Sequence, residues 1–187
     1  KLLLYAKADD SRLAGLDAVD FDTTAVDAIV VRGFAIRGPQ ALRSAMHPIL
    51  LAFDIAGQEA DGVISFFRRK DAAIVDVDVD DLAAHPYGGD ADRPFHVDDR
   101  QGQPLPKFVH VTYSEPLKKY QTGQQRAKRL DSMTPHVVHL NLEGLVLSAQ
   151  QAKDIAERHL WTQWANRRQV TLQLPPSYFG IRENDVV

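Results

Sequence analysis

Four carboxylates lie close together in the first half of the chain and could bind a cation. They are Asp76, Asp78, Asp80 and Asp81. Calcium prefers oxygen ligands, but an EF-hand loop needs glycine at its sixth position and a bidentate glutamate at its twelfth. Counted from Asp76, these positions hold Asp81 and Tyr87. The pattern therefore favours a half-exposed strand over residues 75–79, protected at its edge by charge, and no metal site is expected.

Two glutamates are the candidates for acid–base chemistry. Glu115 precedes Pro116 and Glu143 precedes Gly144, so both lie beside turn-forming residues. A glycan hydrolase needs two carboxylates that face each other across the sugar. The sequence has no G-x-S-x-G, no H-E-x-x-H and no glycine-rich phosphate loop to support these residues. We therefore expect no catalytic residue and no cofactor.

Histidine and cysteine usage argues against zinc. The chain has no cysteine, which excludes disulfides and thiolate ligands. His136 and His139 are three residues apart, and in a strand they would face opposite sides of a sheet. His159 lies on the face of a helix that is predicted to face the core.

A basic cluster surrounds one aromatic residue, Tyr120. Its charges are Lys118, Lys119, Arg126, Lys128 and Arg129. Single-stranded nucleic acid is bound by basic grooves with several stacking aromatics, whereas this cluster has one and the chain's pI is about 6.2. A solvated loop or a protein–protein contact is favoured over nucleic acid. Because tryptophan is enriched at interfaces, one of Trp161 and Trp164 is expected there. The candidate interface residues are Tyr120, Gln125, Arg126, Arg129 and Trp161.

Length and charge describe an ordinary globular chain with an uneven charge distribution. The 187 residues are 44% hydrophobic with a net charge of -3. Residues 1–100 hold 11 basic and 18 acidic side chains (-7), and residues 101–187 hold 11 and 7 (+4). This asymmetry could favour head-to-tail association. No apolar run approaches the ~20 residues that cross a bilayer. The first residue is not Met and the last two are Val, so we expect a segment of a longer protein.

The first half is expected to be an acidic α+β subdomain over residues 1–88. Strand formers occur at 28–31 and 34–36, and a helix is predicted at about 40–52. Pro48 predicts a kink or an early stop near 44–47. Asp61-Gly62 predicts a hairpin over about 53–68.

A loop or linker is expected over residues 89–106, because the region is rich in proline, glycine and aspartate. Such long loops are uncommon, so part of it is expected to pair with another segment or chain. A second α+β subdomain follows over 107–187. Its strands are predicted at 108–113, 137–142 and 170–174, and Ser148 and Gln151 form a capping box for a helix at about 149–166. The intervening Tyr120–Arg129 stretch is interpreted as a structural connector. The fold class is thus α+β, with small mixed or antiparallel sheets each packed by one helix.

The second half resembles the tail-tip proteins of long-tailed bacteriophages and of the related gene-transfer-agent particles. The motifs, in order, are Pro106-Lys107, the strand ending at Tyr113, Tyr120-Gln121-x-Gly123-x-Gln125-x-Ala127-x-Arg129, Ala152, Ala156-Glu157, Trp164, Leu174-Pro175-Pro176 and Asn184-Asp185-Val186-Val187. The first half matches more loosely, through Gly33-Phe34, the helix over 42–51 and the Asp61-Gly62 hairpin. Family members often have glycine where this chain has Asn184, a residue that also tolerates turns.

The resemblance implies a structural component of a phage or prophage tail tip or baseplate hub, within a much longer protein. Such hubs form a trimeric ring at the end of the tail tube, so a homotrimer and other tail proteins are the expected partners. The expected location is the virion tail, assembled in the bacterial cytoplasm. The alternatives are a fragment of a cell-wall glycan hydrolase, which would use Glu115 or Glu143 with an aspartate of the acidic run, and a carbohydrate- or receptor-binding module.

Overall fold

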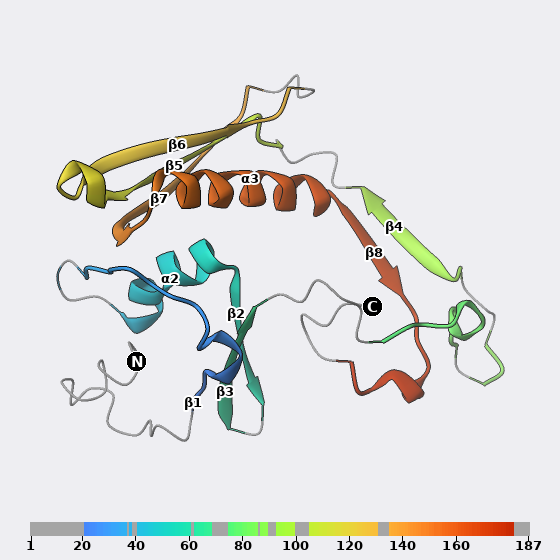
Figure 1. The fold of residues 1–187 in the computed structure, drawn as a ribbon. Coiled ribbons are helices and arrows are strands. Elements are labelled where there is room, and N and C mark those ends of the chain that lie inside the picture. The colour runs from blue at the N-terminus through green and yellow to red at the C-terminus, as the bar shows by residue number, and fades with distance from the viewer. Residues whose placement is uncertain are drawn as a thin grey trace.

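The computed structural model describes residues 21–36, 38, 41–60, 62–68, 75–85, 87–89, 93–99, 105–130 and 135–181. Asp61 and Asn184–Val187, used above, lie outside these residues. In chain order the elements are β1 (Phe21–Asp22), α2 (Leu42–Phe53), β2 (Ile55–Ala60), β3 (Val63–Arg68), β4 (Phe95–Asp99), β5 (Phe108–Glu115), β6 (Gln121–Lys128), β7 (Val137–Val146), α3 (Ala149–Ala165) and β8 (Arg168–Leu172) (Figure 1). Small sheets packed by helices confirm the α+β fold class.

The central sheet has the strand order β6-β5-β7, with β6 antiparallel and β7 parallel to β5. Strand β5 alternates strictly between half-buried and buried residues. Its buried side chains Val109, Val111 and Tyr113 belong to the same core cluster as Ala156 and Leu160 of α3. This follows from the period of two in a strand, which sends one set of side chains to a single face.

Helix α3 begins where the sequence predicts. The Ser148 hydroxyl accepts a hydrogen bond from the Gln151 backbone N–H, and the Gln151 side chain accepts one from the Ser148 N–H. This capping box satisfies two backbone donors that a helix start otherwise leaves unpaired. The predicted helix at about 149–166 is therefore confirmed.

Helix α2 and the β2–β3 hairpin also follow the prediction. The hairpin turn contains Gly62 at a φ of +77°, a conformation that glycine adopts without strain. Strand β3 also pairs with β1 in parallel. A kink or an early stop was expected at Pro48, and the early stop is wrong because the helix continues to Phe53. Asp54 ends it in the left-handed conformation.

One core joins parts of the chain that are distant in sequence. Ala52 of α2 is buried in the same cluster as Leu145 and Ile155, and Arg158 of α3 donates a hydrogen bond to the Ala52 carbonyl. Phe34 forms an isolated bridge with Leu145 of β7. Helix α2 thus packs against β7 and α3 as well as against its own hairpin. The division into subdomains 1–88 and 107–187 stays a prediction.

The segment 89–106 contains strand β4, so the expectation of a loop is wrong at residues 95–99. Strand β4 pairs antiparallel with β8, which confirms that part of this segment pairs elsewhere in the chain. Strand β8 lies two residues earlier than predicted and does not join the central sheet. The two strands form a separate ribbon beyond the end of α3 (Figure 1).

Three further expectations are wrong. Residues 75–78 are not a strand, because Asp78 accepts a hydrogen bond from the Asp80 N–H and starts a 3-10 turn, Val79–Asp81. The strands expected at 28–31 and 34–36 reduce to the single bridge at Phe34. The supposed connector at Tyr120–Arg129 is mostly strand β6.

Candidate subunit interface along strand β6

Strand β6 forms one edge of the central sheet. Within the described part of the chain it pairs with β5 alone. Gly123 and Ala127 are buried beneath it, whereas Gln124, Arg126 and Lys128 are exposed. An edge strand presents a row of unpaired backbone N–H and C=O groups to whatever approaches it. The backbone of this eight-residue edge strand therefore offers hydrogen-bonding groups to which a second chain could add a strand.

A tight turn places Tyr120 at the start of this edge. The turn runs from the 3-10 segment Pro116–Lys118 through Lys119 and Tyr120, both left-handed with φ of 53° and 60°. The Tyr120 N–H donates to the Glu115 carbonyl at 2.9 Å, which closes the turn. The phenol is left 66% exposed. Lys119 and Tyr120 are two consecutive non-glycine residues in the left-handed conformation, which strains the backbone. Such strain clusters at functional positions.

The other end of β6 holds Arg129 between two tryptophans. Its guanidinium carbon lies 4.0 Å from the centroid of the Trp164 ring and 4.9 Å from that of Trp161. Trp164 donates from Nε1 to the Pro106 carbonyl at 2.9 Å, and Arg129 donates from its backbone N–H to the Lys107 carbonyl at 2.9 Å. Arg129 Nε is buried with no hydrogen-bond partner. The two ring faces therefore stabilise a cation whose Nε has no hydrogen-bond partner.

The candidate interface residues lie along β6 and do not converge on one pocket. Tyr120 and Arg129 are separated by the length of the strand, about 30 Å at ~3.3 Å per residue. The side chain of Gln125 lies on the same face of β6 as Gly123 and Ala127, and it is half-buried on the α3 side. Arg126 is exposed on the opposite face. Trp161 is 59% exposed beside Arg129. The arrangement suits an extended contact with a protein and does not enclose a small molecule.

The face of the sheet opposite α3 carries a feature that the sequence analysis missed. His110 of β5 pairs in register with His139 of β7, and their rings are 5.2 Å apart. Phe108 lies edge-on to His110 at 6.3 Å, and the Lys128 ammonium is 5.9 Å from the Phe108 centroid. Side chains alternate between the two faces of a strand, so the registers of β5, β6 and β7 together would have predicted that these four side chains lie on one face.

The two glutamates considered for catalysis do not share a site. Glu115 is 8% exposed, on the α3 side of β5, and pairs with Lys118 at 2.9 Å. The hydrogen bond and charge of Glu115 raise the pKa of Lys118. Glu143 instead lines a hollow of about 220 Å³ with Asn141 and Ser44. The described residues contain no group of three or more His, Asp or Glu side chains that could hold a metal ion; Asp81, for example, accepts a hydrogen bond from the Tyr178 hydroxyl at 2.7 Å.

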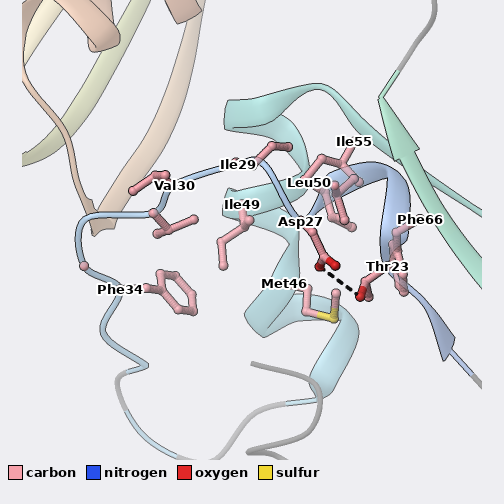
Figure 2. A pocket seen from close by; sticks show the side chains of 13 residues that line it. Thr23, Asp27, Ile29, Val30, Phe34, Met46, Ile49, Leu50, Ile55 and Phe66 are labelled. Atoms are coloured by element: carbon pink, nitrogen blue, oxygen red, sulfur yellow. Dashed lines mark hydrogen bonds between the residues drawn. The ribbon is translucent and has the colours of Figure 1, made fainter. Parts of the chain in front are cut away.

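An apolar groove of about 770 Å³ lies between residues 23–34 and α2, and we call it the α2 groove (Figure 2). Its apolar lining residues include Ile29, Val30, Phe34, Met46, Ile49, Leu50, Ile55 and Phe66. Its polar side chains are Thr23 and Asp27, which hydrogen-bond to each other at 3.3 Å. The groove lacks the convergent polar groups that position a small substrate. It forms by packing distant segments, so no local pattern in the sequence could reveal it.

In the described part of the chain, no helix is both long and apolar enough to cross a membrane.

Comparison with solved structures shows which known fold this chain shares. No curated protein matches the sequence. A chain in the structure titled "Virion of native gene transfer agent (GTA) particle" matches this fold with a TM-score of 0.75 at 23% identity. The match covers 90% of this chain and 36% of that one, so this chain spans about a third of that protein's length. At this identity the likeness shows the fold alone.

The sequence itself carries the family assignment. The family described as "Putative phage tail protein" matches residues 41–187, which include both helices, the hairpin, the central sheet and the β4–β8 ribbon. The matched region is far more than half of the chain. This chain belongs to the putative phage tail protein family and is a structural component of a phage-type tail.

Proposed function

We propose that the chain is part of a tail-tip or baseplate hub that joins the tail tube to the host-recognition or penetration apparatus. The family match over residues 41–187 carries the proposal. The fold supports it, because a chain of a gene transfer agent virion has the same arrangement over 90% of this sequence. Because the chain spans 36% of that protein, we also propose that it is a segment of a longer polypeptide.

The function proposed for this segment is assembly. Its partners would be two further copies in a homotrimeric ring, together with other tail proteins. The free edge of β6, with exposed Tyr120 at one end and Trp161 at the other, supports a contact through backbone pairing and aromatic side chains. The proposed location is the virion tail, after assembly in the bacterial cytoplasm. Subdomains over 1–88 and 107–187, joined by 89–106, would supply separate surfaces of the ring.

Catalysis is not part of the proposal. A glycosidase places its two carboxylates about 5–10 Å apart across one cleft. Here Glu115 is buried toward α3 and ion-paired, while Glu143 lines a different hollow. A receptor- or carbohydrate-binding module would present aromatics along a groove, and the α2 groove is mainly aliphatic, with Phe34 and Phe66 as its aromatic members.

Sedimentation equilibrium of the chain, run beside a peptidoglycan-hydrolysis assay, tests the proposal. We expect reversible trimerisation at high protein concentration and no hydrolysis. Tyr120→Ser and Trp161→Ser should each weaken the trimer, whereas Lys153→Ser, on the exposed part of α3, should leave it unchanged. A monomer that hydrolyses the glycan at a robust rate would contradict the proposal and favour the hydrolase alternative.

A further inference from the structure

Two arginines and two tryptophans gather where the end of β6 meets the end of α3, and we call them the Arg–Trp cluster: Arg129, Trp161, Trp164 and Arg167. Both guanidinium groups lie near the Trp164 ring, at 4.0 Å for Arg129 and 5.9 Å for Arg167. Arg129 is half-buried, whereas Arg167 and Trp161 are exposed. The cluster therefore presents two cations and an open indole ring at the surface.

Neither arginine of the cluster has a carboxylate partner among the described residues. Other basic side chains of the chain have one, and the pairs are Lys118–Glu115, Lys153–Glu157 and Arg168–Asp99. Arg129 Nε is buried with no hydrogen-bond partner. Removing part of the hydration of a cation without supplying an acceptor costs free energy, so this site favours the arrival of an anion.

The chemistry of the cluster suits a carboxylate on an apolar segment. A guanidinium is a planar fork of N–H donors that can bind both oxygens of a carboxylate. The rings already hold Arg129 in place, so little side-chain entropy is lost when an acid binds. Leu130, 78% exposed, and Trp161 lie beside the cations. A peptide that carries an acid next to an apolar side chain matches both features, and an inorganic anion matches only one.

The chain itself carries such a segment, in the 3-10 turn that Asp78 starts. Val79 is 76% exposed, and the carboxylate of the next residue, Asp80, is exposed and has no partner among the described residues. The turn is held in place, because the Asp80 N–H donates to Asp78 at 3.1 Å and the Tyr178 hydroxyl donates to Asp81 at 2.7 Å. An apolar side chain and an acid are thus presented together on a fixed support.

Within one copy, this turn and the Arg–Trp cluster lie at opposite ends of β8. The strand begins directly after Arg167, and Tyr178, which holds the turn, follows its other end. Figure 1 shows the red segment after β8 at the end of this strand that is far from α3. No hydrogen bond or ion pair among the described residues joins the turn to the cluster of the same copy. A second copy is the remaining source of this turn.

We propose that the Arg–Trp cluster of one copy binds the Val79–Asp80 turn of a second copy, with the carboxylate on the two guanidinium groups and the valine against the Trp161 ring. The uneven charge supports a second copy as the partner, since residues 1–100 carry a balance of -7 and residues 101–187 one of +4. The two surfaces differ, so the contact is head-to-tail and closes into a ring when the rotation per copy allows it. This inference rests on the proposed function, because the proposed ring supplies the second copy.

Two aspartates of the same segment test the contact. Asp80→Asn removes the acid that binds the cluster, and Asp76→Asn removes an equally exposed charge four residues earlier. Sedimentation equilibrium should show a dissociation constant of self-association at least ~10-fold higher for Asp80→Asn, and changed less than ~2-fold for Asp76→Asn, because only the first loses a charge-assisted hydrogen bond. Equal effects of the two substitutions would overturn the inference.

Mixing two defective proteins tests whether the contact is head-to-tail. Asp80→Arg damages the turn and Arg167→Asp damages the cluster, so each protein alone should stay monomeric at a concentration where wild type associates. Their mixture retains one intact turn and one intact cluster, and we expect it to form heterodimers. Both tryptophans of the chain belong to the cluster, so the emission spectrum should change on mixing. No dimer and no spectral change would contradict the contact, and circular dichroism checks that both variants fold.

The outcomes separate this inference from the proposed function. If the wild-type chain trimerises while Asp80→Asn has no effect and the mixture stays monomeric, the turn contact is wrong and the hub proposal stands. If the variants behave as expected but tagged tails carry the protein away from the tip, the contact stands and the hub location is wrong. If Arg129→Lys weakens association and Asp80→Asn does not, the cluster binds a different acid and the Asp80 contact is overturned. A wild-type chain that stays monomeric at millimolar concentration also overturns it.

Discussion

The ring of Tyr113 on β5 occupies the space that a side chain at residue 123 on β6 would need. A Cβ built on Gly123 would lie 2.8 Å from Tyr113 Cζ and 3.0 Å from Glu115 Oε2. The two residues are direct partners in the β5–β6 register. The glycine in the Tyr120–Arg129 stretch thus admits a fully buried aromatic ring against the edge strand, an arrangement known to offset the cost of glycine in a strand.

Gly123→Ala should destabilise the chain by about 1–3 kcal/mol, because the added methyl group overpacks a core made of rigid neighbours. Urea denaturation followed by tryptophan fluorescence measures the change. Gly180→Ala is the matched control, since a Cβ there meets nothing within 4 Å and its φ is not in the left-handed region. Equal stability of the two variants would contradict the packing of Tyr113 against Gly123.

Arg129→Ala should cost about 1–2 kcal/mol of stability, since it removes the cation stacked on Trp164 and Trp161. The same variant should change the tryptophan emission spectrum, because both rings lose their neighbour. Arg126→Ala, three residues earlier on the exposed face of β6, should change stability by less than about 0.5 kcal/mol. If Arg126→Ala is the more damaging of the two, the stacking does not stabilise the fold.

Arg158→Met should loosen α2 from α3 at a cost of about 1–3 kcal/mol, because the Ala52 carbonyl loses its charged donor while its surroundings stay buried. Hydrogen exchange should show faster exchange in α2 with little change in β5. Lys153→Met on the same helix removes only an exposed ion pair with Glu157 and serves as the control. Unchanged exchange in α2 would show that Arg158 does not hold the helices together.

His159 should make stability fall as the solution becomes acidic. Burial, and secondarily the charge of Arg158, lower the pKa of His159 below its usual value of about 6.5. Below that value the unfolded chain binds a proton that the folded chain does not, so stability is full above pH ~6.5 and decreases as the pH falls toward the folded pKa. His159→Gln should flatten this part of the pH–stability curve, whereas His96→Gln, on the exposed ribbon, should not. Parallel curves for wild type and His159→Gln would contradict the assignment.

Elements with strong local signals were predictable from the sequence. The capping box at Ser148 and the turn at Gly62 specify their elements through side-chain and backbone chemistry that needs no distant partner. Strand β6 was missed because its buried residues are Gly123 and Ala127, which give almost no hydrophobic alternation. A strand that covers a large ring with small residues looks like a loop in the sequence.

The remaining errors have a tertiary origin. The alternation of valine and aspartate over 75–79 predicts a strand, but a strand needs a neighbour, and Asp78 caps a 3-10 turn instead. Strand β4 is exposed throughout, and among the described strands it pairs with β8, about 70 residues later, so no local pattern specifies it. The α2 groove likewise depends on packing between distant segments.

The location of the protein in an assembled particle tests the central claim most directly. Tails purified from a strain whose gene for this protein carries a short affinity tag, labelled with gold-conjugated antibody, can be imaged by electron microscopy. The hub proposal predicts gold at the tail end distal to the capsid, with no label along the tube. Label distributed along the tube, or tails that carry none while the tagged protein is free in the lysate, would contradict it.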